Sequence, residues 1–123
     1  MTATYTGAVL DAPDAQALAD FYQRLLDWEY EENSPGWVVL RAPDGTARLS
    51  FQRARLYRRP AWPAVDGRQQ MMAHLDIEVD NLATETERAV GLGAEVAGFQ
   101  PQEQVRVCLD PAGPPFCLWV REG

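Results

Sequence analysis

The stretch His74-Leu75-Asp76-Ile77-Glu78-Val79-Asp80 decides the fold, because it begins a second copy of a pattern that the chain has already completed once. It reads as a strand, and Asn81 directly after it is a residue type that caps helices. With a shift of 66 or 67 residues, Asp14 aligns with Asp80 or Asn81, and Leu26 aligns with Leu92. This repeat predicts one structural unit that is used twice.

The first half of the chain predicts a strand, a helix and three further strands. In the helix, Leu18, Phe21 and Leu25 fall at i, i+3 and i+7, which is the spacing of one buried face. Turn-forming residues separate the later strands. The expected elements are a strand at 5–10, a helix at 15–26 and strands at 28–33, 36–42 and 47–52.

The second half predicts the same order. Its expected elements are a strand at 71–79, a helix between Asn81 and the Gly91-Leu92-Gly93 run, and strands at 95–99, 104–109 and 116–120. Residues 53–70 have no sustained periodicity and predict a linker. We therefore expect one α+β domain, with module one at 1–52, the linker at 53–70 and module two at 71–123.

Several phrases of the sequence carry a resemblance to a known superfamily. They are residues 9–14 before the first helix, 21–28 through it, 74–80 at the start of module two and 110–113 before the last strand. In this order they resemble the glyoxalase, bleomycin-resistance and extradiol-dioxygenase proteins, or vicinal oxygen chelate superfamily, and within it the small glyoxalase-like domain proteins. The resemblance covers nearly the whole chain and implies two βαβββ modules that form a cupped mixed sheet.

The resemblance also gives positions for a metal site. Enzymes of the superfamily hold a divalent metal with side chains from the first, fourth, fifth and eighth strands. These positions fall here on Gly7, on Ser50 or Gln52, on His74 and on Cys117. Glycine has no donor, and a neutral hydroxyl or amide binds a divalent ion weakly, so only His74 is a ready ligand. We therefore expect no metal and no other cofactor.

Alternation along the strands predicts which side chains share a face. His74 and Asp76 lie on the polar face of their strand, which by resemblance looks into the cup, and Trp119 shares the side of Cys117. For the fourth strand, a polar binding face and a solvated edge remain equally open. The expected ligand-binding residues are Ser50, Gln52, Met72, His74, Asp76, Cys117 and Trp119.

His74 has two interpretations. It is either an inert, hydrogen-bonded remnant of a ligand position or an acid–base group, and the inert interpretation is favoured because a base also needs a positioned partner. Trp62, in the linker, must dock onto a module or a second subunit to cover its apolar surface. Cys108 and Cys117 are expected to be small apolar residues rather than nucleophiles.

Charge limits the choice of partners. The chain has 11 basic and 18 acidic residues and a formal net charge of -7, which opposes nucleic-acid binding and favours cationic or neutral ligands. The arginines at 53, 55, 58 and 59 pair either with carboxylates of this chain or of a partner subunit, or they hold an anionic ligand group. We expect a homodimer, with the modules closing within one chain or swapping between chains.

The remaining composition favours a cytoplasmic protein. Two cysteines are too few for a disulfide scaffold, and no apolar run approaches the ~20 residues that a membrane helix requires. The leading hypothesis is metal-independent binding or sequestration of a small molecule, of the bleomycin-resistance type. The alternatives are a lyase, isomerase or dioxygenase, either metal-dependent or using His74 as acid or base, and a scaffold subunit whose own side chains fill the cavity.

Overall fold

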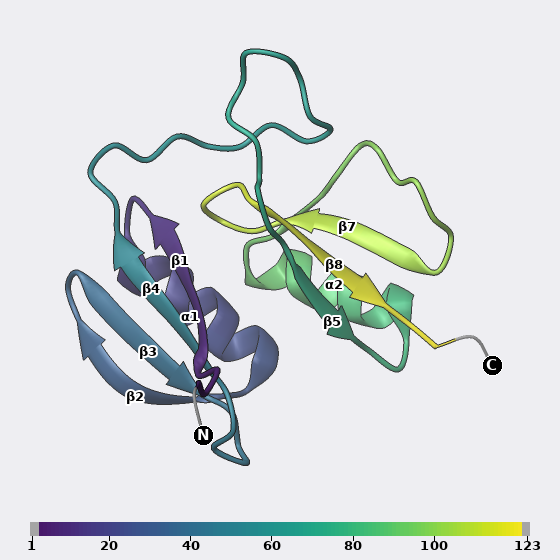
Figure 1. The fold of residues 1–123 in the computed structure, drawn as a ribbon. Coiled ribbons are helices and arrows are strands. Elements are labelled where there is room, and N and C mark those ends of the chain that lie inside the picture. Colours follow the sequence, from purple (N-terminus) through teal and green to yellow (C-terminus); the bar gives the residue numbers. More distant parts are fainter. Residues whose placement is uncertain (1–2, 122–123) are drawn as a thin grey trace. The chain divides into compact units, whose positions relative to one another are not determined.

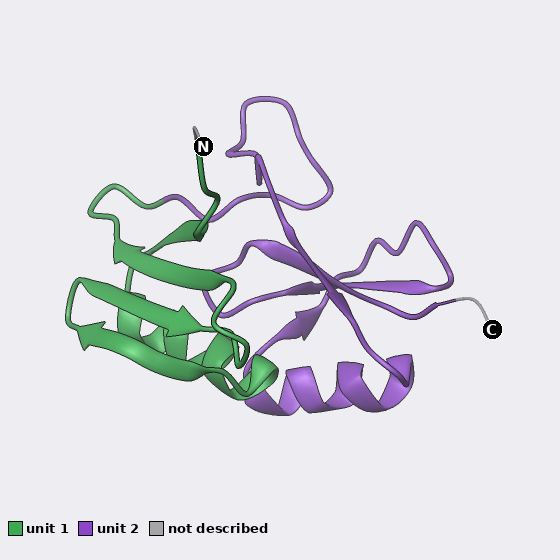
Figure 2. Ribbon diagram, turned by 60° about the horizontal axis from the view of Figure 1, so that its bottom comes forward, with its two compact units in different colours: residues 1–57 green, residues 58–123 purple. Residues whose placement is uncertain are grey.

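The computed structural model describes residues 3–121. The chain divides into two compact units, residues 1–57 and 58–123 (Figure 2). The division falls inside the predicted linker, so most of that segment belongs to unit 2. Among residues 3–121, no helix is long and apolar enough to cross a membrane.

Unit 1 is a four-stranded mixed sheet with one helix against one face, and its strand order is β1-β4-β3-β2 (Figure 1). Its elements are β1 (Gly7–Ala12), α1 (Ala15–Leu26), β2 (Glu29–Ser34), β3 (Trp37–Arg41) and β4 (Arg48–Arg53). β1 runs parallel to β4, and the other neighbours are antiparallel. The Asp14 side chain caps α1 by accepting a hydrogen bond from the Ala17 amide at 3.1 Å.

The core of unit 1 lies between α1 and the sheet. The predicted apolar stripe of α1 is buried, and its Tyr22 ring stacks on Phe51 of β4 with a centroid separation of 5.9 Å. Phe21 meets the same tyrosine edge to face. Both Tyr22 and Phe51 are essentially inaccessible to solvent, so this aromatic pair anchors the helix.

Unit 2 repeats the order of elements, and its strand order is β5-β8-β7-β6 (Figure 1). Its elements are β5 (Leu75–Glu78), α2 (Leu82–Leu92), β6 (Glu95–Val96), β7 (Val105–Leu109) and β8 (Pro115–Trp119). β5 runs parallel to β8, and Asn81 caps α2 by accepting from the Thr84 amide at 2.9 Å. The α+β fold with two βαβββ modules is therefore confirmed.

Two predicted strands are shorter than expected. The strand predicted at 71–79 begins only at Leu75, because Met72 has a left-handed backbone (φ 65°) that interrupts an extended chain. The strand predicted at 95–99 ends at Val96. Beyond it, the Gln100 side chain takes over the pairing: its amide donates to the Val107 carbonyl and accepts from the Val107 amide, both at 2.8 Å.

Candidate functional site

The two sheets carry different side chains on the face that turns away from their helix. The register pairs Val9 with Ser50 in unit 1, and Asp76 with Cys117 in unit 2. A shift of 67 residues relates these pairs, and it also relates Gly7 to His74. At these three positions unit 1 has glycine, valine and serine, whereas unit 2 has histidine, aspartate and cysteine.

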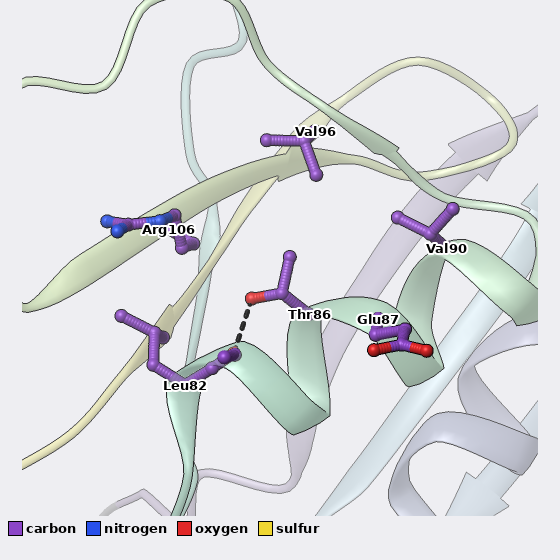
Figure 3. Close-up of a pocket in the computed structure, with 7 residues that line it drawn as sticks. Leu82, Thr86, Glu87, Val90, Val96 and Arg106 are labelled. Carbon is purple, nitrogen blue, oxygen red and sulfur yellow. Dashed lines mark hydrogen bonds between the residues drawn. The ribbon is translucent and has the colours of Figure 1, made fainter.

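One hollow of unit 2 is a groove of about 490 Å³ beside α2 (Figure 3). It is lined by Leu82, Ala83, Thr86, Glu87, Val90, Val96 and Arg106. The Thr86 hydroxyl in this groove is already hydrogen-bonded, because it donates to the Leu82 carbonyl at 2.6 Å. Arg106 donates to two backbone carbonyls. The groove is thus mainly apolar, with the Glu87 carboxylate in its lining.

The second hollow, of about 390 Å³, lies on the other face of the sheet and collects the groups that can do chemistry. We call it the His74 pocket. Its lining consists of Trp62, His74, Asp76, Pro101, Gln102, Gln104, Val105, Val107, Cys117, Trp119 and Val120. Apolar and aromatic walls with a few convergent polar groups are typical of a small-molecule site. Its chemistry makes it the candidate site despite its smaller volume.

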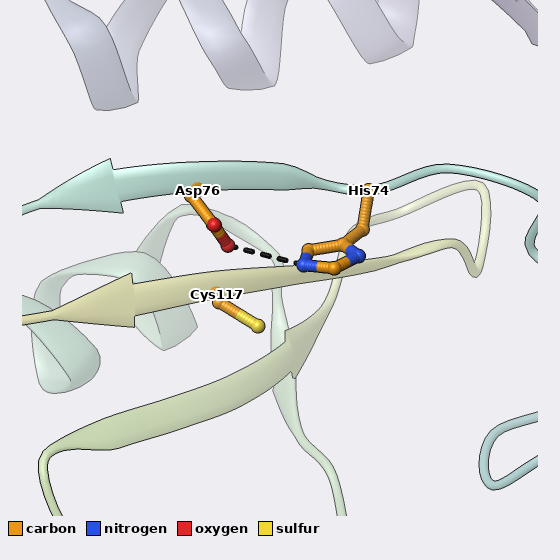
Figure 4. A group of neighbouring side chains, drawn as sticks. All are labelled: His74, Asp76 and Cys117. Atoms are coloured by element: carbon orange, nitrogen blue, oxygen red, sulfur yellow. Dashed lines mark ion pairs between the residues drawn. The ribbon is translucent and has the colours of Figure 1, made fainter.

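Three polar side chains meet at one end of this pocket (Figure 4). His74 Nε2 lies 3.1 Å from Asp76 Oδ1, and the Cys117 sulfur completes a group whose donor atoms all lie within 4.8 Å of one another. The carboxylate favours a proton on Nε2 and fixes the ring orientation. About a third of the His74 side chain is exposed, so it is reachable from solvent.

Cys117 is poorly suited to act as a nucleophile. Burial raises the pKa of its thiol, and the nearby Asp76 carboxylate raises it further. The thiol therefore stays protonated at neutral pH. It supplies a polarisable contact and a weak hydrogen-bond donor to the pocket.

Arg121 and Glu78 help to hold the Trp119 ring in place. The Arg121 guanidinium lies 5.6 Å from the ring centroid, and its Nε is 2.6 Å from Glu78 Oε2. The cation over one face of the indole is attracted to its π-system, and the carboxylate fixes the cation. The ring is therefore pre-oriented as a wall of the His74 pocket.

The wall formed by Trp62 comes from the segment predicted as a linker. Its indole Nε1 donates to the Phe99 carbonyl at 3.3 Å, and the two rings lie 6.1 Å apart. The expected docking of Trp62 onto a module is thus observed within unit 2. Gln102 and Gln104 were not predicted, and a polar loop gives no sequence signal for them. Val105 and Val107 could have been found by alternation, because they pair with Trp119 and Cys117.

Of the seven predicted ligand-binding residues, four line the His74 pocket: His74, Asp76, Cys117 and Trp119. Met72 does not line it and is 85% exposed. Ser50 and Gln52 belong to unit 1, where Ser50 is buried and Gln52 donates to Asp11 at 2.7 Å. The binding roles of these three residues stay predictions.

The side chains at the superfamily's metal positions do not form its ligand set. No side chain can stand at Gly7, because a Cβ there would overlap the Arg48 carbonyl oxygen. The fourth-strand positions offer only a buried hydroxyl and an amide engaged with Asp11. The remaining two positions, His74 and Cys117, lie in unit 2 and form one group of possible ligand atoms with Asp76. The donors present thus do not fit a catalytic metal held by both modules.

A family model for the glyoxalase-like domain matches residues 7–119. The chain belongs to the glyoxalase-like domain family. It is therefore a member of the vicinal oxygen chelate superfamily, as the sequence predicted. None of the curated proteins matches the chain.

Solved structures show the same fold. A glyoxalase/bleomycin resistance protein/dioxygenase family enzyme from Burkholderia phytofirmans PsJN has a TM-score of 0.71 at 19% identity, with 96% of this chain and 98% of that chain covered. A possible glyoxalase from Bacillus cereus gives 0.68 at 13% identity, covering 97% and 99%. The oxidase ChaP-H2 gives 0.66 at 17% identity, covering 99% and 96%. These three structures support the fold.

Proposed function

We propose that this glyoxalase-like domain binds a small molecule in the His74 pocket without a metal ion. The observation that carries the proposal is that the His74–Asp76 pair and two tryptophans line the same hollow of unit 2. The tryptophans and valines would bury the apolar part of the ligand, and the polar pair would orient it. Sequestration of a toxic compound, the resistance-type role, is one use of such a site.

The ligand class follows from the lining. The flat indoles of Trp62 and Trp119 favour a planar aromatic group. The Asp76 carboxylate favours a ligand that donates hydrogen bonds or carries a positive charge, which agrees with the chain's net charge of -7. We therefore expect planar, neutral or cationic heteroaromatic compounds to bind better than anionic ones.

A binding screen tests this function. Tryptophan fluorescence and thermal shift are measured against matched cationic, neutral and anionic heteroaromatic compounds, and affinities of the hits are determined with and without EDTA. His74→Gln is expected to weaken binding about 10-fold or more, the value of a hydrogen bond to a charged group. Trp119→Ala is expected to weaken it similarly, through lost stacking and burial.

A matched control and metal analysis complete the test. Trp28→Phe changes a tryptophan in unit 1 that does not line the pocket, so affinity should stay within about 2-fold. Stoichiometric zinc, nickel, iron or manganese in protein purified without chelator, and lost in His74→Ala, would contradict metal-independent binding. Absence of any hit in all three ligand classes would contradict binding itself.

The His74–Asp76 contact also supports a second candidate function, acid–base catalysis. An imidazole oriented by a carboxylate is the arrangement that a general base requires. This candidate predicts that a bound compound is turned over, and that His74→Ala reduces turnover far more than binding. Binding of unchanged ligand, with equal affinity loss in His74→Ala and His74→Gln, favours sequestration.

A further inference from the structure

One wall of the His74 pocket is formed by the connection between β6 and β7, and this connection differs between the two units. In unit 1 the pairing of β2 with β3 continues to the turn, where Ser34 pairs with Trp37. In unit 2 the last strand pair of β6 with β7, within the described residues, is Val96 with Cys108. Residues 97–104, which we call the wall segment, supply three residues of the pocket lining: Pro101, Gln102 and Gln104.

The wall segment leaves backbone groups of β7 without a strand partner. The pair Tyr30–Leu40 of unit 1 corresponds to Val96–Cys108, because each is the second pair of its ladder. The chain between the paired residues is 31–39 in unit 1 and 97–107 in unit 2, so it is two residues longer in unit 2. Backbone groups that are buried without a partner are costly, so those of β7 must be satisfied in another way.

The side chain of Gln100 satisfies them. Its Nε2 donates to the Val107 carbonyl and its Oε1 accepts from the Val107 amide, both at 2.8 Å. The same Nε2 also donates to the Ala97 carbonyl at 2.9 Å, which ties the wall segment to itself. Val107 is only 3% exposed, so loss of the Gln100 side chain would leave its buried amide unpaired. The side-chain amide thus replaces a strand partner, while the main chain of Gln100 runs outside the sheet.

The wall segment is also held at its far end. There the Val120 amide donates to the Gln104 carbonyl at 3.3 Å. Between this point and Gln100 lies Pro101, which has no N–H group with which to resume strand pairing. The residues of the pocket wall therefore lie between two fixed points, of which Gln100 is the one made by a side chain.

A second wall of the pocket depends on the same segment. Trp62 Nε1 donates to the carbonyl of Phe99, the residue directly before Gln100, at 3.3 Å. The Trp62 and Phe99 rings lie 6.1 Å apart. Because Gln100 fixes the neighbouring peptide, it also fixes the acceptor to which the Trp62 indole is bonded.

We propose that Gln100 is a positioning residue of the His74 pocket. By replacing the strand partner of Val107, its side chain holds the wall segment away from β7 and so places the loop wall and the acceptor of Trp62. Gln100 is not among the residues that line the pocket, so it acts on a ligand through its neighbours. This inference rests on the proposed function, because the position of a wall affects affinity only if the pocket binds a ligand.

The first measurement is affinity for a defined probe. 9-Aminoacridine, a planar cationic heteroaromatic compound, is titrated into the full chain, and its Kd is determined from its fluorescence. Gln100→Met keeps the length of the side chain but removes both polar atoms. It is expected to raise the probe Kd about 10-fold or more, because the wall is then no longer pre-organised for binding.

The second measurement is a local signal that general destabilisation would not move. The indole N–H resonance of Trp62 in NMR spectra is expected to shift and to exchange faster with solvent in Gln100→Met, because its bond to the Phe99 carbonyl weakens. The indole resonances of Trp28 and Trp37, both in unit 1, are expected to stay in place. A merely less stable folded chain would show no such selective change at one indole.

A matched control removes a similar amide from unit 1. Gln23 also donates through Nε2 to a backbone carbonyl, that of Trp28, at 2.9 Å. Gln23→Met should leave the probe Kd within about 2-fold and the Trp62 signal in place. If Gln100→Met does not fold, Gln100→Glu is measured in the same two ways, since it keeps the acceptor for the Val107 amide and removes the donor.

The outcomes separate this inference from the proposed function. If the wild-type chain binds the probe, an unchanged Kd in Gln100→Met or an unchanged Trp62 signal would each overturn the positioning role and leave the proposed function intact. If the wild-type chain does not bind the probe, the result counts against the proposed function. The Trp62 signal alone then decides whether Gln100 holds the wall of the pocket.

Discussion

The two units have the same order of elements, but they bury their helices differently. α1 buries six residues against its sheet, whereas α2 buries Ala89. Ala89 stands 67 residues after Tyr22, and both are fully buried, so a methyl group occupies the place of an aromatic ring. The groove beside α2 is lined by other residues of this helix, among them Thr86 and Val90 (Figure 3).

On the sheet faces that turn away from the helices, unit 2 rather than unit 1 has the larger and more reactive side chains at three related positions. Unit 1 places Gly7 and Val9 where unit 2 places His74 and Asp76, and it places Ser50 where unit 2 places Cys117. The better-packed module thus carries the less reactive face. Because α1 buries six residues whereas α2 buries Ala89, we expect unit 1 to be the more stable module, while unit 2 bears the cost of polar groups in a hollow.

The largest expected effect comes from deleting the aromatic anchor of unit 1. Phe51→Ala should lower the free energy of unfolding by about 3–5 kcal/mol, because it removes a fully buried ring that stacks on Tyr22. Leu118→Ala, at the related position of unit 2, should lower the free energy of unfolding by about 2–4 kcal/mol. We expect this loss to be smaller than that of Phe51→Ala because the packing around α2 is looser. Urea unfolding measures both. A larger loss for Leu118→Ala would reverse the assignment of unit 1 as the more stable module.

The second effect is a pH dependence that belongs to unit 2. Burial raises the pKa of the Cys108 thiol to about 11, from an ordinary value of 9.0. Between these values the unfolded chain loses the proton while the folded chain keeps it, so this contribution is complete below pH 9 and is lost as pH rises toward 11. Two pKa units correspond to at most about 2.7 kcal/mol.

Unfolding measured from pH 8 to 11 tests this dependence. Cys108→Ala should be less stable at pH 8 and should show a shallower decline above pH 9 than the wild type. Cys117 lies on the opposite face of the hairpin, because Cys108 pairs with Phe116, so no disulfide between the two thiols should form on oxidation. An equal slope in wild type and Cys108→Ala would show that other groups cause the decline.

The third comparison tests whether the groove is unfilled space. Ala19 is fully buried against the sheet of unit 1, and Ala19→Leu should destabilise by about 1–3 kcal/mol through overpacking. Thr86, 67 residues later, lines the groove, and Thr86→Leu should stabilise by up to about 1 kcal/mol, because leucine fills apolar space and favours helix. Thermal unfolding of the two variants measures the sign. Destabilisation by both would mean that the groove is not available to a larger side chain.

The sequence predicted the elements and their order because repeated caps and periodic apolar residues act locally. Asp14 and Asn81 cap the helices at the expected positions. The prediction was wrong at Met72, whose backbone turns left-handed, and at the end of β6, where a glutamine side chain replaces strand pairing. Neither event follows from residue type or alternation.

The candidate site was predictable to the extent that it lies on regular strands. The resemblance gave the positions of His74 and Cys117, and alternation added Asp76 and Trp119 on the same strand faces. Trp62 needed the tertiary structure, since its contact with Phe99 spans 37 residues of chain. Gln102 and Gln104 lie on a loop, where side-chain direction has no period.

The smallest expected effect comes from the two caps, whose chemistry is the same in both units. Asp14→Ala and Asn81→Ala each remove one side-chain acceptor from a helix amide and should each lower the free energy of unfolding by about 1 kcal/mol. Their local effects should differ, because α1 is held by its buried face and α2 is not. Amide hydrogen exchange should therefore accelerate in the first turn of α2 in Asn81→Ala, while the first turn of α1 in Asp14→Ala still opens mainly by global unfolding. Equal acceleration in both helices would show that the caps, rather than the buried faces, hold the helix ends.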